Sequence, residues 1–455
     1  MMATRTIPIA ACLSGVLLLT QTLLGQTVSD EAASRGARVV DQLVAGQTGA
    51  IAREFDPAMA AALSEDRLRS IWAGLVAQTG AFKRRTGVQA EARGPNTAVV
   101  VSCEMERASI DVQVVFTANG KIGGLAFRPA APAVAYTLPA YASPAQYTER
   151  DVTIGSGEWM LPGTFTRPVR DSLVPAVVLV HGSGPSDRDE TAGANKPFRD
   201  LALGLASSGI AVLRYEKRTR QYPGKVGAIP RFTVKDETID DALAAVKFLR
   251  SDPSIDARRI VVLGHSLGGT LVPRIGKLDA GIAGFVVLAG GVRQLDDAIL
   301  TQLHYLAEAD GTVTPAEREQ LDAETKALEP VKRLTVADLS DPKPIAGAPA
   351  SYWLDLRGYD PPSSARDLRQ PMLILQGERD YQVTMADFAE WRAALGGRPD
   401  VTLRSYPGLN HAFVAGTGKS LPQEYTVPGH VDGSVVRDIA EWVQAVPPSG
   451  GSTGR

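Results

Sequence analysis

The most informative segment of the 455-residue chain reads Arg259-Ile260-Val261-Val262-Leu263-Gly264-His265-Ser266-Leu267-Gly268. Its apolar first half is typical of a buried β-strand, and its second half matches the pattern G-x-S-x-G. In this pattern a nucleophilic serine sits on a sharp turn between a strand and a helix, and the glycines remove side chains that would collide there. The segment therefore predicts a strand, a strained turn and a helix, with the hydroxyl of Ser266 above the edge of a sheet.

Alternating strands and helices extend on both sides of this segment. Continuous apolar runs of strand length lie at 176–180, 211–213, 260–263, 285–288 and 372–375, and the helical stretches between them include 236–250 and 385–395. Buried parallel strands separated by helices are typical of a doubly wound α/β sheet, which we predict for residues 149–446. The mostly helical segment 293–366 is predicted to form a cap at the carboxyl end of this sheet, where ligands bind.

Residues 30–130 have a different pattern, which predicts a separate small α+β domain. Ser64 is a suitable N-cap for an amphipathic helix whose expected buried face consists of Leu68, Ile71, Trp72, Leu75 and Val76. Apolar and polar residues then alternate over 110–117, and Asn119-Gly120 predicts a hairpin turn before a further strand. The stretch 131–148 is predicted to be a linker and 447–455 a flexible tail.

The amino terminus and the composition indicate where the protein acts and which partners are excluded. The apolar stretch after Arg5 is too short and too interrupted for a membrane span, so residues 1–26 are predicted to be a signal peptide of an exported protein, periplasmic or secreted. The 48 Lys and Arg residues nearly balance the 50 Asp and Glu residues, which argues against nucleic acid as the main partner. The two cysteines, Cys12 and Cys103, are too few for a disulfide framework.

A serine nucleophile of this kind needs an acid and a base, which follow it along the chain in the order Ser, Asp or Glu, His. Asp380 comes just after the apolar run 372–375, and His411 follows the strand predicted at 401–406. Because parallel strands end at the same edge of a sheet, Ser266, Asp380 and His411 are predicted to meet there. These three residues are the candidate catalytic triad.

Other residues compete for each of these roles. Glu378 is an alternative acid, and His430, in a loop before the last helix, is an alternative base. The pattern G-x-S-x-G also recurs at Gly450-Gly451-Ser452-Thr453-Gly454, but no predicted strand precedes this copy and no predicted helix follows it. We therefore assign the nucleophile to Ser266.

The loop after the predicted strand 176–180 reads His181-Gly182-Ser183-Gly184-Pro185. A loop of this type directs a backbone N–H at the substrate oxygen, so the amides of Ser183 and Leu267 are predicted to form a two-donor oxyanion hole. The alternative is an ordinary glycine-rich turn between a strand and a helix. The chemistry expected of such a site needs no metal and no organic cofactor.

With these motifs, residues 149–446 resemble the α/β-hydrolase superfamily, and more narrowly its bacterial serine esterases with a helical cap. The resemblance rests on five segments: His181-Gly182-Ser183-Gly184-Pro185, 264–268, Tyr352-Trp353-Leu354-Asp355-Leu356, Gln376-Gly377-Glu378-Arg379-Asp380 and Asn410-His411. Residues 30–130 resemble the DUF3887 domain, a small NTF2-like fold. The resemblance implies a carboxylic-ester hydrolase that acts on a small-molecule ester through an acyl-enzyme.

Two other functions are open at this point. A serine peptidase of the capped α/β-hydrolase type would use the same triad, whereas a non-catalytic binding protein would use none. The residues expected at the substrate pocket are His181, Tyr352, Trp353 and Tyr381. Cap residues considered for an acyl pocket also include His304, Tyr305 and Tyr359, and simple packing of the cap onto the sheet is their alternative role.

A cluster of basic residues follows Tyr215. Lys217, Arg218 and Arg220 are predicted to form a solvent-exposed turn, and binding of an anionic substrate is the alternative. Neither the acyl length of the substrate nor the oligomeric state follows from these patterns.

Overall fold

The structure is a computed structural model that describes residues 30–93, 96–129, 136–227, 229–341 and 344–450. The chain divides into two compact units, made mainly of residues 21–135 and of residues 136–455. The predicted signal peptide lies outside the described residues, as do the last five residues of the predicted tail. Within the described ranges, no helix is both long and apolar enough to cross a membrane.

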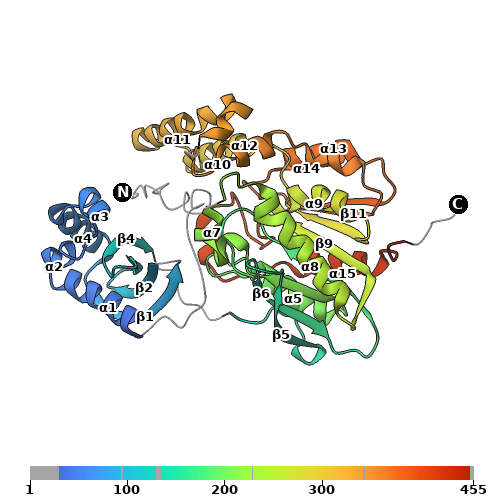
Figure 1. The fold of residues 1–455 in the computed structure, drawn as a ribbon, viewed down its shortest axis with the longest axis horizontal. Helices are drawn as coiled ribbons and strands as arrows, with labels where there is room; N and C mark the ends of the chain where they lie inside the picture. Colours follow the sequence, from blue (N-terminus) through green and yellow to red (C-terminus); the bar gives the residue numbers. More distant parts are fainter. Residues whose placement is uncertain (1–29, 94–95, 130–135, 228, 342–343, 451–455) are drawn as a thin grey trace. The chain divides into compact units, whose positions relative to one another are not determined.

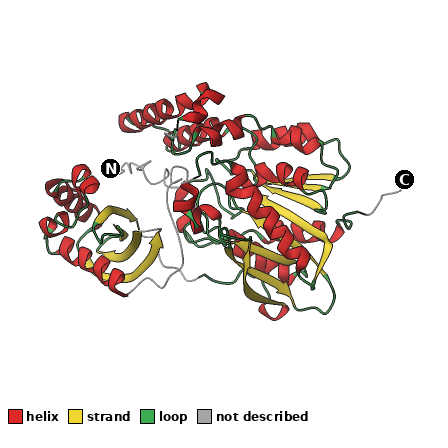
Figure 2. Cartoon of the chain, viewed as in Figure 1, coloured by secondary structure: helices red, strands yellow, loops and turns green. Residues whose placement is uncertain are grey.

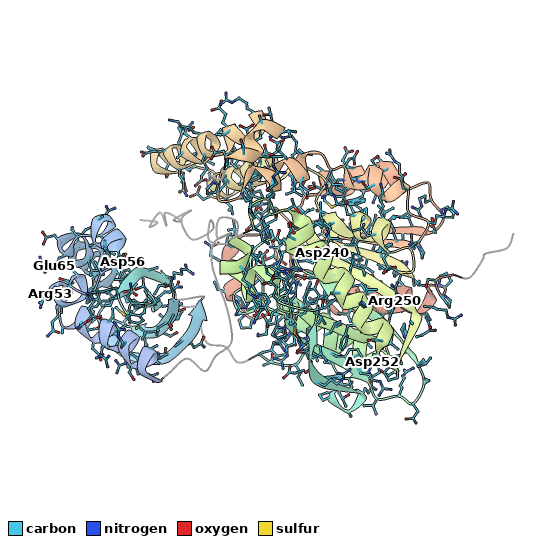
Figure 3. All side chains as sticks on the ribbon, viewed as in Figure 1. Arg53, Asp56, Glu65, Asp240, Arg250 and Asp252 are labelled. Carbon is cyan, nitrogen blue, oxygen red and sulfur yellow. The ribbon has the colours of Figure 1, made fainter. Side chains whose placement is uncertain are left out.

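The amino-terminal unit is a four-stranded antiparallel sheet with helices packed against it (Figure 1). Its elements are α1 (Asp30–Val44), α2 (Thr48–Ala52), α3 (Pro57–Ala62), α4 (Glu65–Thr79), β1 (Phe82–Arg93), β2 (Asn96–Met105), β3 (Ser109–Phe116) and β4 (Ile122–Pro129). The strands lie side by side in chain order. Asp56 caps α3 by accepting a hydrogen bond from the amide of Met59 at 2.7 Å (Figure 3). Val40, Leu68 and Val112 belong to the separate core of this unit.

The structure confirms the predicted helix and hairpin of this unit. The helix is α4, and the hydroxyl of Ser64 accepts a hydrogen bond from the amide of Arg67 at 3.3 Å as its N-cap. Strands β3 and β4 form the hairpin, with Gly120 at a φ of 72° in its turn. The expectation for Ile71 was wrong, because its side chain is 40% exposed while Trp72 is buried. Strand β1 was missed because it is an edge strand with mostly exposed, polar residues.

The second unit is built on an eight-stranded sheet with helices on both faces (Figure 2). Its strands are β5 (Tyr147–Ile154), β6 (Leu161–Pro168), β7 (Val174–Val180), β8 (Ala211–Tyr215), β9 (Ile255–His265), β10 (Gly284–Leu288), β11 (Met372–Gly377) and β12 (Val401–Tyr406). They lie in the order β12-β11-β10-β9-β7-β8-β6-β5, and those from β12 to β8 run parallel. An antiparallel hairpin of β5 and β6 completes the edge. The predicted doubly wound α/β fold is confirmed.

Helices cover the sheet and bury its apolar strands. They are α5 (Pro197–Ser207), α8 (Asp240–Ser251), α9 (Leu267–Leu278), α14 (Met385–Leu395) and α15 (Gly433–Ala445). The short helices α6 (Arg218–Gln221) and α7 (Pro223–Gly227) follow β8 in the chain, and η3 (Pro144–Gln146), η4 (Lys235–Ile239) and η6 (Pro422–Thr426) are short turns. Helices α5 and α15 pack together over a core that includes Val177, Leu263 and Leu375. Helices α8 and α9 pack against β9, the strand that leads to Ser266.

The segment predicted as a cap is helical. It contains α10 (Leu295–Ala307), α11 (Pro315–Arg333), η5 (Val336–Ser340), α12 (Ala350–Arg357) and α13 (Pro361–Arg366). Helix α10 packs against α11, and both lie with α12 along one side of this unit in Figure 1. Helix α13 packs instead against α9 and α14, so the chain has returned to the sheet before residue 366.

Part of the stretch predicted as a linker makes hydrogen bonds to the second unit. Its residues 131–135 lie outside the described part of the chain. The described residues pack on the second unit: the hydroxyl of Tyr136 donates to Oδ1 of Asp200 at 2.7 Å, and that of Tyr141 donates to the carbonyl oxygen of Val431 at 2.8 Å. Strand β5 then begins at Tyr147. The Pro- and Ala-rich composition gave no sign of these hydrogen bonds, because the acceptors of both tyrosines are distant in the sequence.

Candidate active site

Ser266 occupies the turn between β9 and α9 with a φ of 52° and a ψ of −120°. A positive φ is costly for a residue with a side chain, so the surrounding structure must hold the turn in place. The amide of Ser266 donates a hydrogen bond to the carbonyl oxygen of Leu288, at the end of β10, at 2.9 Å. The strained turn expected from the sequence is therefore present and is tied to the neighbouring strand.

The glycines around Ser266 are required by close backbone packing. A Cβ atom on Gly264 would overlap the carbonyl oxygen of Gly268, and one on Gly268 would overlap the carbonyl oxygen of Val180. A Cβ atom on Gly182 would lie 3.0 Å from the Cβ atom of Ser266. The loop 181–185 and the serine turn thus touch each other, as an oxyanion hole would need.

Asp380 and His411 are in direct contact. Nδ1 of His411 lies 2.6 Å from Oδ2 of Asp380, and both side chains are buried. The other carboxylate oxygen of Asp380 accepts hydrogen bonds from the amides of Gln382 at 2.8 Å and Val383 at 3.0 Å. The side-chain amide of Gln376 donates to Oδ2 at 3.2 Å. These donors fix the direction of the carboxylate toward the imidazole.

Neighbouring residues hold His411 beside the serine turn. The ring of His265, the residue before Ser266, lies 4.6 Å from the ring of His411, and its Nε2 lies 3.0 Å from the carbonyl oxygen of His411. The side-chain oxygen of Asn410 accepts hydrogen bonds from the amides of Ala412 and Val414, both at 3.1 Å. The loop after β12 is thereby fixed against the turn after β9.

The two rival residues lie in other surroundings. The carboxylate of Glu378 accepts a hydrogen bond from the hydroxyl of Ser405 at 2.7 Å on the exposed side of the sheet edge. Nδ1 of His430 pairs with Oδ1 of Asp200 at 3.0 Å. The geometry therefore pairs Asp380 with His411 and leaves Glu378 and His430 in separate contacts.

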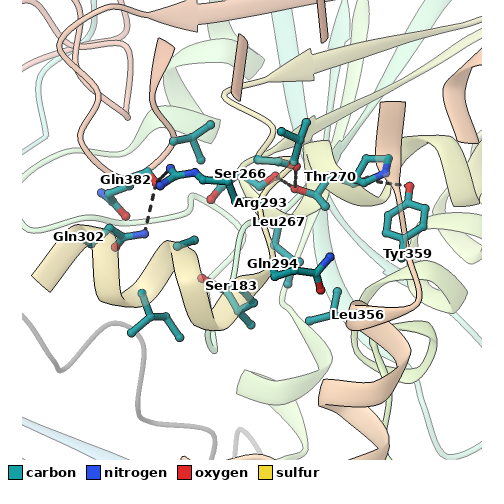
Figure 4. A pocket seen from close by; sticks show the side chains of 17 residues that line it. Ser183, Ser266, Leu267, Thr270, Arg293, Gln294, Gln302, Leu356, Tyr359 and Gln382 are labelled. Carbon is teal, nitrogen blue, oxygen red and sulfur yellow. Dashed lines mark hydrogen bonds between the residues drawn. The ribbon is translucent and has the colours of Figure 1, made fainter. Parts of the chain in front are cut away.

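A cavity of about 90 Å³ opens beside Ser266 (Figure 4). Ser183 and Leu267, the two predicted oxyanion residues, line it together with Ser266. Leu267 is the first residue of α9, so its amide belongs to the helix N-terminus, whose first amides have no partner within the helix. In the described part of the chain, the amide of Ser183 likewise has no hydrogen-bond partner. Both amides thus belong to residues of the cavity wall and have no partner within the described residues.

Comparison with known proteins agrees with this arrangement. Residues 177–422, more than half of the chain, match the family model described as "Alpha/beta hydrolase family". The chain belongs to the α/β-hydrolase family. Residues 37–125 of this hydrolase match the model described as "Protein of unknown function (DUF3887)", which identifies the amino-terminal unit.

Relatives of this hydrolase include named esterases. Esterase EstD of Thermotoga maritima is 39% identical over 383 residues, which cover 84% of this chain and 88% of that protein. A monoacylglycerol lipase of Mycolicibacterium smegmatis is 28% identical over 241 residues, covering 52% of this chain and 80% of the lipase. A solved esterase structure from Pyrococcus furiosus is 18% identical with a TM-score of 0.41, covering 67% of this chain and 92% of its own. On the basis of the long match to EstD, this enzyme is classified as a carboxylesterase-type hydrolase.

Of the aromatic cap residues considered for an acyl pocket, Tyr359 lines the cavity of this hydrolase. Residues from both the cap and the sheet edge form its wall; they include Thr270, Arg293, Gln294, Ile299, Gln302, Leu356, Tyr359 and Val383. Figure 4 shows Tyr359 at one end, where its hydroxyl donates to the carbonyl oxygen of Thr270 at 2.8 Å. The guanidinium of Arg293 is paired with the buried carboxylate of Asp387 at 2.8 Å, which compensates its charge.

The four residues expected at the pocket do not line this cavity and make other contacts. His181 is buried with Nε2 3.0 Å from the carbonyl oxygen of Asp187, and burial lowers the pKa of its ring to about 4. Tyr352 is buried with its hydroxyl on Glu237, and the indole N–H of Trp353 donates to the carbonyl oxygen of Ile345. The ring of Tyr381 stacks on that of Tyr305, with the centroids 5.0 Å apart. Contacts within the protein explain these four side chains better than substrate contact does.

The prediction of a solvent-exposed basic turn was wrong for Lys217 and Arg218. Lys217 is only 2% exposed and pairs with Glu237, and Arg218 is only 6% exposed and pairs with Asp241. The two carboxylates follow 20 and 23 residues later in the chain, on η4 and α8, so the sequence carried no local sign of the pairing.

Glu190 is a partly buried acid near the site that no sequence pattern indicated. Its Oε1 accepts a hydrogen bond from the amide of Gly182 at 2.6 Å, and its Oε2 lies 2.8 Å from Nδ1 of His265. The other ring nitrogen, Nε2, faces the carbonyl oxygen of His411 at 3.0 Å and donates to it, because a carbonyl oxygen can only accept. Burial opposes the charged forms, but the partners outweigh it: the pKa of Glu190 is lowered and that of His265 is raised. This ion pair joins the loop 181–185 to the serine turn.

A metal site does not emerge from the described ranges, in which no three or more His, Cys, Asp and Glu side chains are grouped to hold an ion.

Proposed function

We propose that this enzyme is a serine carboxylic-ester hydrolase that uses Ser266, His411 and Asp380 as a catalytic triad. The observation that carries the proposal is the buried contact between His411 and Asp380 beside the strained turn of Ser266. Because Nδ1 of His411 faces the carboxylate, Nε2 is the ring nitrogen left to accept the serine proton. The match to EstD supports an ester as the bond that is cleaved.

The first half of the proposed reaction forms an acyl-enzyme. The hydroxyl oxygen of Ser266 attacks the ester carbonyl while Nε2 of His411 takes its proton. Asp380 holds the imidazole in the required tautomer and stabilises the imidazolium. The amides of Ser183 and Leu267 donate to the oxyanion of the tetrahedral intermediate, and removal of one such donor costs about 3 kcal/mol in the barrier. The C–O bond then breaks, and His411 gives its proton to the leaving alcohol.

The second half releases the acid. Water enters where the alcohol has left, and His411 takes its proton as the oxygen attacks the acyl carbonyl. A second tetrahedral intermediate uses the same two amides. Its collapse breaks the bond to Ser266, which receives the proton from His411.

The cavity favours small, uncharged acyl groups. Its volume of about 90 Å³ limits the size of the acyl group that it can hold. Its wall mixes apolar groups such as Ile299 and Leu356 with amides such as Gln302, and the charge of Arg293 is compensated. We therefore expect short-chain esters to be better substrates than long-chain ones.

The function is tested by labelling and by a substrate panel. A fluorophosphonate probe should label Ser266, and p-nitrophenyl acetate and butyrate should be hydrolysed faster than the corresponding long-chain esters and aminoacyl-anilides. Absence of labelling on a folded protein would support a binding protein instead. Faster cleavage of the anilides would make the enzyme a serine peptidase.

The oxyanion hole is tested by separating the Ser183 side chain from its amide. Ser183→Ala keeps the amide, so kcat should fall by less than about tenfold. Ser183→Pro removes the N–H and restricts φ, so kcat should fall by about 10²-fold or more. Turnover and melting temperature of both variants should be measured together. A folded Ser183→Pro enzyme with normal turnover would remove Ser183 from the site, and an inactive Ser183→Ala would give its hydroxyl a role.

The amino-terminal unit is expected to be dispensable for hydrolysis itself. Ser266, Asp380 and His411 all belong to the second unit, and the elements that hold them do as well. A chain lacking residues 30–130 should therefore retain turnover of p-nitrophenyl acetate, even if its solubility is lower. A folded, soluble truncation without esterase activity would show that the DUF3887 unit helps to build the site.

A further inference from the structure

The structure assigns a positioning role to Lys217, which lies outside the cavity. Its ammonium holds the peptide group between Gly182 and Ser183 so that the amide of Ser183 faces the reacting oxygen. The inference rests on the oxyanion hole proposed above and adds to it the residue that orients one of its donors.

Lys217 contacts this peptide group directly. Its Nζ donates to the carbonyl oxygen of Gly182 at 2.6 Å and to Oε1 of Glu237 at 2.5 Å. The other carboxylate oxygen of Glu237 accepts a hydrogen bond from the hydroxyl of Tyr352, on α12, at 2.7 Å. Lys217 and Tyr352 are each 2% exposed and Glu237 is fully buried. A continuous series of hydrogen bonds between buried polar groups thus runs from the cap to the loop 181–185.

The geometry of a peptide group connects this contact to catalysis. The carbonyl of Gly182 and the N–H of Ser183 belong to one planar unit, and no peptide bond in the described residues is cis. The C=O and N–H of a trans peptide point in opposite directions, so anchoring the carbonyl on Lys217 sets the direction of the N–H. The positive charge of the Lys217 ammonium beside the carbonyl oxygen also polarises this peptide group and makes the N–H of Ser183 a stronger donor.

Gly182 is held from its other side as well. Its own amide donates to Oε1 of Glu190 at 2.6 Å, so one partly buried carboxylate and one buried ammonium hold the two peptide groups of this residue. Glu190 has a φ of 50°, which is unusual for a residue with a side chain. The loop is therefore fixed by charged contacts, and not by its glycines alone.

A neighbouring ion pair allows the positioning role of Lys217 to be distinguished from simple stabilisation of the fold. Arg218, on α6, pairs with Asp241, on α8, and both are buried. The guanidinium of Arg218 lies on Asp241 and 4.6 Å from the ring centroid of Trp159, away from the carbonyl of Gly182. This pair has the same kind of burial and charge as Lys217–Glu237 without the contact to the loop. It is the matched control.

The test compares the double variants Lys217→Met/Glu237→Met and Arg218→Met/Asp241→Leu of the full chain. Replacing both members of a buried ion pair by apolar residues is often tolerated, whereas removing one member leaves a buried charge unpaired. With p-nitrophenyl acetate, the Lys217 variant should lose about 10²-fold in kcat at nearly constant KM, as expected when an oxyanion donor is lost. The Arg218 variant should keep its kcat even where its melting temperature falls.

A transition-state analogue gives a readout that stability alone would not move. A trifluoromethyl ketone adds to the nucleophilic serine, and the resulting oxyanion occupies the same hole. For the Lys217 variant its inhibition constant should rise by the same factor by which kcat/KM falls. If the Met variant does not fold, Lys217→Gln/Glu237→Gln replaces it: glutamine is uncharged and one bond shorter than lysine, so its kcat should still fall at least about tenfold.

Two outcomes would overturn the inference. A folded Lys217 variant with wild-type kcat, or equal losses of kcat in the Lys217 and Arg218 variants, would reduce the contact to a structural ion pair. An inactive wild-type chain that is not labelled at Ser266 would instead refute the proposed function, and the positioning role with it. The wild-type measurement therefore distinguishes the two failures.

Discussion

Ser266→Ala is expected to lower kcat for p-nitrophenyl acetate by about 10⁴-fold or more while the protein stays folded. The hydroxyl oxygen forms the covalent bond of the acyl-enzyme. No other residue of the segment 264–268 carries a hydroxyl that could replace it. Alanine leaves the backbone contacts of the turn, including the hydrogen bond from residue 266 to Leu288, in place. Turnover, fluorophosphonate labelling and melting temperature measure the three parts of this expectation.

The matched control for this variant is Ser452→Ala. Ser452 stands in the second G-x-S-x-G copy and lies outside the described residues. Its replacement should leave kcat and labelling at wild-type values. If the tail variant were inactive and Ser266→Ala active, the nucleophile would have been assigned to the wrong copy.

Asp380→Asn is expected to lower kcat by about 10⁴-fold. The carboxylate accepts from Nδ1 of His411 at 2.6 Å, and an amide in its place can favour the tautomer that protonates the wrong ring nitrogen. His411→Ala should be similarly impaired. Because the triad acts as a unit, the double variant should be barely slower than the worse single variant, as kcat measurements of all three will show.

Glu378→Gln is the control for the acid. Its carboxylate accepts a hydrogen bond from Ser405 and is not in contact with His411, so kcat should be unchanged. An active Asp380→Asn enzyme together with an inactive Glu378→Gln enzyme would move the acid to Glu378. Losses that multiply in the Asp380 and His411 double variant would show that the two residues do not share one mechanism.

Fully buried strands of the sheet could be predicted from the sequence more easily than exposed ones. Every residue of β7, β10 and β11 is buried, and a strand buried on both faces reads as a continuous apolar run. Strand β5 has four consecutive exposed residues, and β1 is also largely exposed, so their sequences show neither an apolar run nor a clear alternation. In the large sheet, sequence patterns identified the strands from β8 to β12 and missed the antiparallel hairpin of β5 and β6 at the opposite edge.

The candidate triad was predictable because its signals are local. Each of Ser266, Asp380 and His411 follows a recognisable strand, and parallel strands bring their carboxyl ends to one edge. The contact of 2.6 Å between His411 and Asp380 is a result of the fold, but the pattern already selected the two residues that make it. The wall of the cavity was not predictable, because it combines cap helix α10 with loops that lie far apart in the chain.

The amino-acid sequence by itself determined the α/β class, the serine turn with its glycines and the order of the three candidate catalytic residues. Short-range patterns carry this information, since burial of a strand and crowding at a turn restrict the residue types at fixed spacings. Only the tertiary structure decided that Lys217 is buried on the carbonyl of Gly182, with Tyr352 on its partner Glu237, and that Glu190 joins the loop to His265. These buried charges depend on partners from distant elements, and a charged residue looks the same in the sequence whether its partner is water or a carboxylate.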